Sequence, residues 1–243
     1  MSEQDPQRIL DDTAMNWRQY VVVAIMVALN ALDGFDVLSS AFAAPGISKE
    51  WGVSREALGI VLSAELVGMG FGSIILGGIA DKTGRKPAML LCLVVMAIGM
   101  YMAHAASGVT ELTAWRFITG LGIGGMLAAT NAVTAESTSK AGRSLSMAIY
   151  VIGYPLGGVI GGFAAQTWLL QVYDWRAVFL FGAVMTAMMI PLVMIFVPET
   201  TAFLNAARPA NALDRINKTL TAFGKQTIAA LPALVEGAPK PRV

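Results

Sequence analysis

The chain has 243 residues, of which 56% are hydrophobic and only 14% are charged, with 25 Gly and 14 Met, so its composition is not that of an ordinary soluble domain. Its formal net charge of +1 gives no electrostatic basis for binding nucleic acid. One cysteine inside an apolar run, one histidine and the lack of any zinc-ligand spacing, phosphate-binding loop or nucleophile–base pattern predict that the chain is not an enzyme and holds neither a metal nor a cofactor.

The chain begins with a polar, acidic segment, which we predict to be a tail over residues 1–17. The apolar run that follows, residues 20–44, is too long for the core of a secretory signal peptide and reaches the ~20 residues that a helix needs to cross a bilayer. Trp17, Arg18 and Tyr20 at its start are amphipathic side chains typical of a membrane interface. The run therefore predicts a first membrane span.

This span contains two carboxylates, Asp33 and Asp36. Each costs about 2.5–3.5 kcal/mol in the middle of a membrane helix. Three positions apart, they share one helix face with a rise of about 4.5 Å between them. We expect them to face a water-filled cavity or partner cations. Two roles remain open: the handling of protons or substrate, and a buried ion pair that only holds helices together.

Residues 45–56 predict an external loop, with Ser54 as the N-cap of a second span over residues 57–80. Glu65 lies in this span at a depth comparable with the two aspartates. It is either a third titratable group or the partner of a polar neighbour, and the sequence leaves both roles open. Close helix packing is favoured by three glycines of this span, Gly68, Gly70 and Gly72.

A short charged island, residues 77–87, separates the second span from the next apolar run. Its cations place it on the cytoplasmic side by the positive-inside rule. We expect its first two glycines to bring the helix end close to a neighbour, its third glycine to permit a sharp reversal, and its charged side chains to pair with adjacent helix ends. These residues are Gly77, Gly78, Gly84, Asp81, Arg85 and Lys86.

The third span, residues 87–107, consists largely of Met, Leu, Val and Ala, and we predict a peripheral, lipid-facing helix. The fourth, residues 112–135, carries Arg116 about one turn below the external surface. This arginine either extends to the interface or forms a bidentate contact with a carboxylate, of substrate or of an aspartate. The glycines that follow it favour packing against protein. Glu136 and Arg143 flank a short polar loop at the cytoplasmic end.

The fifth span, residues 144–168, has glycines four apart and one proline. Small residues at this spacing predict a flat face for close helix contact, and the proline predicts a kink. These residues are Gly153, Gly157, Gly161 and Pro155.

An external turn at residues 174–176 precedes a sixth span, residues 177–197. Beyond it, residues 199–243 predict a polar linker with one amphipathic helix capped near Asn211 and an end rich in proline that is disordered. The apolar positions that recur at helical spacing are Leu213, Ile216, Leu220 and Phe223.

The charged island resembles the signature loop between helices two and three of the major facilitator superfamily, G-x-x-x-D-x-x-G-R-K, read here as Gly77, Asp81, Gly84, Arg85 and Lys86. This resemblance implies an all-α membrane protein, in which six transmembrane helices (residues 18–198) form the N-terminal bundle of the facilitator fold from two inverted three-helix repeats. Spans one and four would then lie beside a central cavity. The resemblance also implies that Glu136 and Arg143 engage the signature loop.

Within that superfamily, Asp33, Gly34 and Asp36 resemble the Asp-Gly-x-Asp of the aromatic acid:proton symporter family. The Arg-Phe-x-x-Gly that starts at Arg116 is similar to the same family, as is a fifth helix with Gly and Pro bordering the substrate path. The resemblance implies that the two aspartates and Arg116 serve transport, with Gly34 in helix packing.

The implied function is import of benzoate- or hydroxybenzoate-type acids with protons by alternating access, without a cofactor other than the proton gradient. The implied partners are the lipid bilayer and a C-terminal six-helix half that this sequence lacks. The protein would lie in the plasma (inner) membrane with both termini in the cytoplasm. Two alternatives remain open: a facilitator for a sugar or a non-aromatic organic acid, and a truncated six-span protein that transports nothing.

Overall fold

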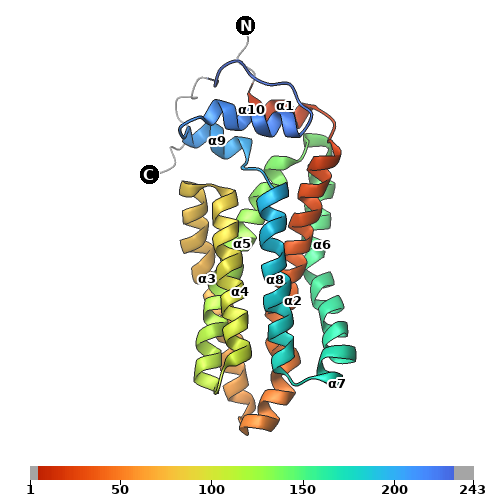
Figure 1. The fold of residues 1–243 in the computed structure, drawn as a ribbon, viewed down its shortest axis with the longest axis vertical. Coiled ribbons are helices and arrows are strands. Elements are labelled where there is room, and N and C mark those ends of the chain that lie inside the picture. Colours follow the sequence, from red (N-terminus) through yellow and green to blue (C-terminus); the bar gives the residue numbers. More distant parts are fainter. Residues whose placement is uncertain (1–4, 233–243) are drawn as a thin grey trace.

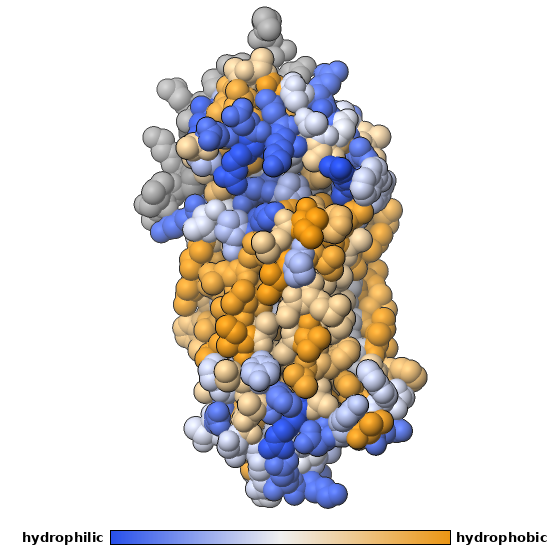
Figure 2. Space-filling view, viewed as in Figure 1, coloured by the Kyte–Doolittle hydropathy of each residue, from blue (hydrophilic) through white to orange (hydrophobic). Residues whose placement is uncertain are grey.

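Six long helices form one bundle in the computed structural model, which describes residues 5–232 (Figure 1). All six are long and apolar enough to cross a membrane, as predicted. On the face drawn in Figure 2, apolar residues cover the middle of the molecule and hydrophilic residues gather at both ends. The bundle helices are α2 (Trp17–Trp51), α3 (Arg55–Thr83), α4 (Arg85–Ala105), α5 (Val109–Ser137), α6 (Lys140–Ala164) and α8 (Arg176–Phe196).

Three short helices cover one end of the bundle (Figure 1): α1 (Pro6–Asp12), α9 (Thr201–Ala207) and α10 (Ala212–Ala222). The acidic start of the chain is thus partly helical, because the Asp5 side chain accepts a hydrogen bond from the Gln7 backbone N–H at 3.0 Å and Leu10 is buried in the core.

The amphipathic helix predicted after the sixth span is α10, and a further short helix, α9, which the sequence analysis did not predict, precedes it. The side chain of Thr200 starts α9 by accepting a hydrogen bond from the Phe203 N–H at 3.3 Å. The second helix, α10, begins after Asn211 as expected, although the Asn211 side chain makes no capping bond. Its positions Ile216, Leu220 and Phe223 are buried. The predicted disordered end lies largely in residues 233–243, outside the described residues.

The predicted external loop over residues 45–56 is wrong, because α2 continues through Pro45 to Trp51 and ends at Gly52, whose φ is +62°. Glu50, on this extension, is held by α8: it accepts hydrogen bonds from Trp175 Nε1 at 2.7 Å and from both Arg176 Nη atoms at 2.7 and 2.8 Å. The predicted N-cap is confirmed, since Ser54 Oγ accepts from the Ala57 N–H at 3.3 Å.

The third span, which we predicted to be a peripheral, lipid-facing helix, has two different faces. One face of α4 is fully buried against α5 and α8, with Met89, Leu93, Met96 and Met100 at 0% exposure. The opposite face stays exposed. A helix that is apolar on every side gives no signal of which side meets protein, because lipid and core are equally apolar.

The predicted glycine face of the fifth span is confirmed. A Cβ atom at Gly157 would run into the Ala31 carbonyl oxygen of α2, and one at Gly161 would run into the Phe35 ring. The two helices therefore pack at backbone distance. Beyond Ala164 the chain continues as a π-helix (η1, Ala165–Leu169) and a last turn (α7, Leu170–Val172), which the sequence did not indicate.

Candidate functional site

The interior of the bundle holds an ionic cluster that joins three helices. Arg116 of α5 forms an ion pair with Glu65 of α3, and the two side chains are 0% and 1% exposed. The same guanidinium donates from Nη2 to the backbone carbonyl of Asp36 on α2 at 2.5 Å and from Nη1 to Met100 Sδ at 2.8 Å. It also lies 5.4 Å from the centroid of the Phe179 ring.

Small residues bring α3 and α5 close enough for this pair. A Cβ at Gly120 would run into the carbonyl oxygen of Glu65 itself, and one at Gly124 into that of Met69. In the other direction, Gly68 contacts the Phe117 carbonyl in the same way. The expectation that the glycines after Arg116 pack against protein is therefore confirmed.

We predicted that Arg116 either extends to the membrane interface or contacts a carboxylate, and its position favours the second. A fully buried guanidinium with an ion-pair partner does not extend to the interface. Its carboxylate partner is Glu65 and not an aspartate, so Glu65 faces a charged neighbour. The sequence placed the three carboxylates at similar depth without indicating which of them Arg116 meets.

The two aspartates of α2 are buried, at 1% and 0% exposure. Within the described residues, Asp33 Oδ2 and both carboxylate oxygens of Asp36 have no hydrogen-bond partner. Their burial means that neither carboxylate faces a water-filled cavity in this conformation. Arg116, the cation near Asp36, contacts the backbone carbonyl of Asp36 and not its carboxylate. The carboxylate of Asp36 lies beside α8, because a Cβ at Gly182 would come within 2.9 Å of its Oδ1.

Gly34, between the two aspartates, allows close contact between α2 and α6. A Cβ there would run into the carbonyl oxygen of Tyr154 on α6. The glycine therefore lets α2 and α6 touch at the level of the two carboxylates, as its expected packing role requires.

A second set of polar residues, missed by the sequence analysis, lies one helical turn away. Asn30 Nδ2 donates to the Tyr150 carbonyl oxygen at 2.6 Å, and the hydroxyls of Tyr150 and Thr130 are 2.9 Å apart. All three are buried and join α2, α5 and α6. The available signal was the spacing, since Asn30 precedes Asp33 by three positions and so shares its helix face.

The signature loop is a short reversal between α3 and α4 at Gly84, whose φ of +110° favours glycine. Glu199, three residues after the end of α8, binds this reversal: its carboxylate oxygens accept from the N–H of Arg85 at 2.9 Å and of Lys86 at 3.3 Å. Burial raises the pKa of Glu199, and these backbone donors oppose that rise. The sequence analysis missed this carboxylate, although its neighbour Pro198 marks the end of the sixth span.

The charged side chains of the loop pair with adjacent helix ends, as predicted. Arg85 forms an ion pair with Asp81 and lies 3.8 Å from Glu136 of α5, while Lys86 Nζ donates to the Met194 carbonyl oxygen of α8 at 2.7 Å.

Two expectations about the loop are wrong. Gly78 faces open space, with no atom within 4 Å of the place that a Cβ would take, and only Gly77 approaches a neighbour, since its Cβ would lie 3.5 Å from the Ala128 Cβ. Arg143 does not engage the loop. It binds Asp11 of α1 and donates to the carbonyl oxygens of Ala135 at 2.9 Å and Thr138 at 3.2 Å, because α1 supplies the nearer carboxylate.

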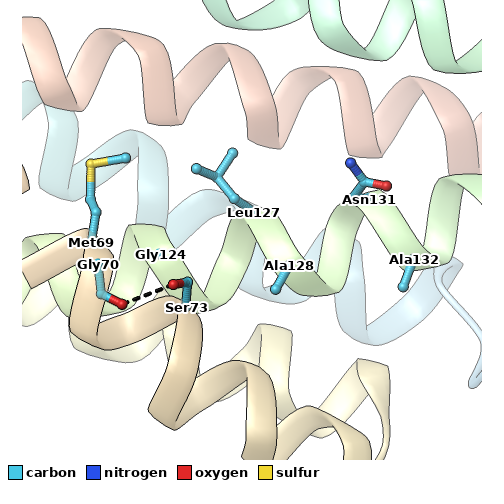
Figure 3. A pocket seen from close by; sticks show the side chains of 8 residues that line it. All are labelled: Met69, Gly70, Ser73, Gly124, Leu127, Ala128, Asn131 and Ala132. Atoms are coloured by element: carbon cyan, nitrogen blue, oxygen red, sulfur yellow. Dashed lines mark hydrogen bonds between the residues drawn. The ribbon is translucent and has the colours of Figure 1, made fainter.

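A shallow groove between α3 and α5 contains none of the predicted site residues (Figure 3). Two exposed polar side chains line it, Ser73 and Asn131, and the Ser73 hydroxyl donates to the Gly70 carbonyl oxygen at 2.8 Å. Within residues 5–232, no group of three or more His, Cys, Asp or Glu side chains is placed to hold a metal ion.

Six apolar helices with an ionic cluster inside the bundle define a membrane-embedded protein with a polar interior. The family model described as Major Facilitator Superfamily matches residues 23–236. The chain belongs to this family, whose members are membrane transporters and not enzymes.

Individual relatives agree. The chain is 32% identical over 226 residues to the 4-hydroxybenzoate transporter PcaK of Pseudomonas putida, a match that covers 93% of this chain and 50% of the relative. It is also 32% identical to a gallate transporter of Pseudomonas putida, over 84% of this chain and 45% of the relative. The chain thus spans about half the length of the curated relatives it matches.

Among solved structures, the partially occluded inward-open xylose transporter XylE from E. coli superposes with a TM-score of 0.70 at 16% identity. The match covers 84% of this chain and 54% of that one. It supports the fold alone: the six helices form one half of a facilitator bundle, as the signature loop predicts.

Proposed function

We propose that the chain forms the N-terminal half of a transporter that imports aromatic carboxylates together with protons. The support for the substrate class is the similarity to transporters of 4-hydroxybenzoate and gallate over most of this chain. The observation that carries the mechanism is the buried cluster itself, in which Arg116 of α5 meets Glu65 of α3 and the backbone of Asp36 on α2. Asp33 is buried three positions before Asp36 on the same helix.

The charge balance of this cluster favours proton binding. The described membrane spans bury three carboxylates, Asp33, Asp36 and Glu65, but only one cation, Arg116. An ionised group inside a membrane domain costs about 2.5–3.5 kcal/mol unless it is compensated. A proton on one carboxylate removes one of these charges. A substrate carboxylate that binds Arg116 would displace Glu65, which would then take up a proton, so substrate and proton would enter the site together.

Alternating access fits the closed state of the cluster. Arg116 is fully buried, so the substrate reaches it only after the helices around it have moved. In the facilitator fold this movement is a rocking of two six-helix halves around a site between them. We propose that the second half docks on the exposed apolar faces of α3 and α6, which include Ile74 at 76% and Val159 at 70% exposure.

We further propose a plasma (inner) membrane location with both termini in the cytoplasm. The support is that both described chain ends lie at the same end of the bundle (Figure 1), together with the cationic signature loop. In this arrangement residues 1–17 are a cytoplasmic segment, residues 18–198 the membrane domain and residues 199–243 a cytoplasmic linker. No cofactor is needed beyond the proton gradient.

The test is uptake of radiolabelled 4-hydroxybenzoate by cells that express the complete transporter. We expect Asp36→Asn to abolish accumulation driven by an imposed pH gradient. The amide has a similar size, but it is always neutral and neither binds nor releases a proton. Asp214→Asn, an identical change at an exposed position of α10, is the matched control and should leave uptake unchanged.

A second measurement separates coupling from binding. Exchange of internal for external substrate without a pH gradient should persist in Asp36→Asn if the site still binds the acid. Gradient-driven accumulation by this variant at the rate and pH dependence of the unmodified protein would refute the coupling role.

A further inference from the structure

A cationic pocket lies at the end of the bundle that carries α1, α9 and α10, apart from the ionic cluster. It has a volume of about 570 Å³ and is bounded by the start of α2, the end of α8 and one side of α10. Four cationic side chains line it, each from a different part of the chain or a different turn of α10: Arg18, Lys86, Arg215 and Lys218. The fold thus brings cations of α2, α4 and α10 to one pocket.

The pocket carries an excess of positive charge. Its one carboxylate, Glu199, is buried and already accepts hydrogen bonds from the N–H groups of Arg85, Lys86 and Thr200. Within the described part of the chain, none of the four cations forms an ion pair with a carboxylate. Lys86 Nζ already donates one hydrogen bond, to the Met194 carbonyl oxygen at 2.7 Å, but this bond does not balance its charge. An anion with several oxygen acceptors would therefore meet cations that form no ion pair within the described residues.

The other wall of the pocket is apolar and open to the side. Met194, Ile195 and Phe196, on the last turn of α8, line it and are 57%, 72% and 46% exposed. Trp17 lies at its edge at 60% exposure, with the Arg18 guanidinium 5.4 Å from its ring centroid. Exposed tryptophan at a helix start is typical of the boundary between hydrocarbon and headgroups.

We propose that this pocket binds an anionic phospholipid, with the headgroup phosphate between the cations and the acyl chain along the end of α8. A free phosphate would use the cations but not the apolar wall. A neutral lipid would use the wall but not the cations. Only an anionic lipid matches both surfaces. The pocket lies at the start of α2 and the end of α8, where two membrane spans end and headgroups are expected.

The test uses the purified chain in detergent and three probes: dioleoylphosphatidylglycerol, dioleoylphosphatidylcholine with the same acyl chains, and inorganic phosphate. The unfolding temperature is followed with a thiol-reactive dye at Cys92, the one cysteine of the sequence, which is buried and becomes reactive on unfolding. We expect the phosphatidylglycerol to raise this temperature in a saturable manner, and the other two probes to have little effect.

The double variant Arg215→Gln/Lys218→Gln should need about thirtyfold more phosphatidylglycerol for half of the effect, since each cation near a lipid headgroup contributes about 1 kcal/mol. The matched control, Arg8→Gln/Lys140→Gln, removes the same charge from exposed sites of α1 and α6 and should keep the original response. Lys218→Arg keeps the positive charge and should also keep the original response to phosphatidylglycerol. This result would show that position 218 tolerates substitution.

Three results would overturn the proposal. An equal response to phosphatidylcholine would show that binding does not require an anionic headgroup. Stabilisation by inorganic phosphate alone would indicate a site for a free anion. An equal loss in the control variant would indicate general surface attraction without a pocket.

Discussion

Breaking the buried ion pair on one side only should destabilise the protein strongly. In Glu65→Leu, Arg116 keeps the Asp36 carbonyl and the Met100 sulfur as partners but loses the carboxylate that neutralises it. Within the described residues no other carboxylate forms an ion pair with Arg116. An uncompensated buried charge of this kind costs about 3–5 kcal/mol.

That cost corresponds to a fall in the unfolding temperature of roughly 6–20 °C, at about 2–4 °C per kcal/mol for a chain of this size. The double variant Glu65→Leu/Arg116→Met removes both charges and fills similar volume, so it should recover at least half of the loss. The assay is again the thiol-reactive dye at buried Cys92. Asp214→Asn, at an exposed position, serves as the control and should stay within 1–2 °C, that is about 0.5 kcal/mol.

The reasoning fails in either of two cases. If Glu65→Leu unfolds within 2 °C of the unmodified chain, roughly the 0.5 kcal/mol of an ordinary surface change, the pair does not compensate a buried charge. If the double variant falls by the sum of both single variants, the two side chains contribute independently, and the contact between them has no coupling energy.

Two further predictions concern packing and topology. Gly157→Ala should destabilise the bundle by about 1–3 kcal/mol, because its Cβ would run into the Ala31 carbonyl oxygen, whereas Gly78→Ala, which faces open space, should be neutral or slightly stabilising in the same thermal assay. Reporter fusions after Lys140 and Arg215 should report the cytoplasm and fusions at Gly52 and Asp174 the exterior; a cytoplasmic signal at Asp174 would contradict six spans.

The bundle could be predicted from the sequence because membrane spans depend on length and hydropathy alone. All six spans lie where the apolar runs predict them, and the signature loop identifies their arrangement. Helix ends were harder to predict. The loop expected from Pro45 onward is helix, since Glu50 gains its partners Trp175 and Arg176 from a segment more than 120 residues away.

The residues of the ionic cluster could be predicted, but their pairing could not. A charged residue inside an apolar run stands out in any sequence, and Asp33, Asp36, Glu65 and Arg116 were all found in that way. Which carboxylate meets Arg116 depends on the rotation of α3 against α5, and the glycines that set it, Gly68 and Gly120, look the same as other glycines in the sequence. The contact of Glu199 with the signature loop could not be predicted either, since 114 residues separate Glu199 from Arg85.

The glycine contacts divide the bundle interior into two tightly packed helix pairs. In the first pair, α3 and α5 touch along Gly68, Gly120 and Gly124 and are joined by the ion pair between Glu65 and Arg116 inside the bundle. The second pair, α2 and α6, touches along other glycines and is joined by Asn30 and the Tyr150 carbonyl. Each pair therefore resists internal movement.

The contacts between the two pairs are fewer, and polar contacts occur among them beside apolar ones. Arg116 donates to the Asp36 carbonyl oxygen, and Thr130 and Tyr150 share a hydroxyl contact of 2.9 Å. Because backbones in glycine contact have no room to slide, a change of shape in this domain has to occur at this joint. The unpartnered carboxylate of Asp36 lies at the same joint. A proton gained or lost there changes the charge beside Arg116, so the proposed coupling residue is placed where it can bias the position of one helix pair against the other.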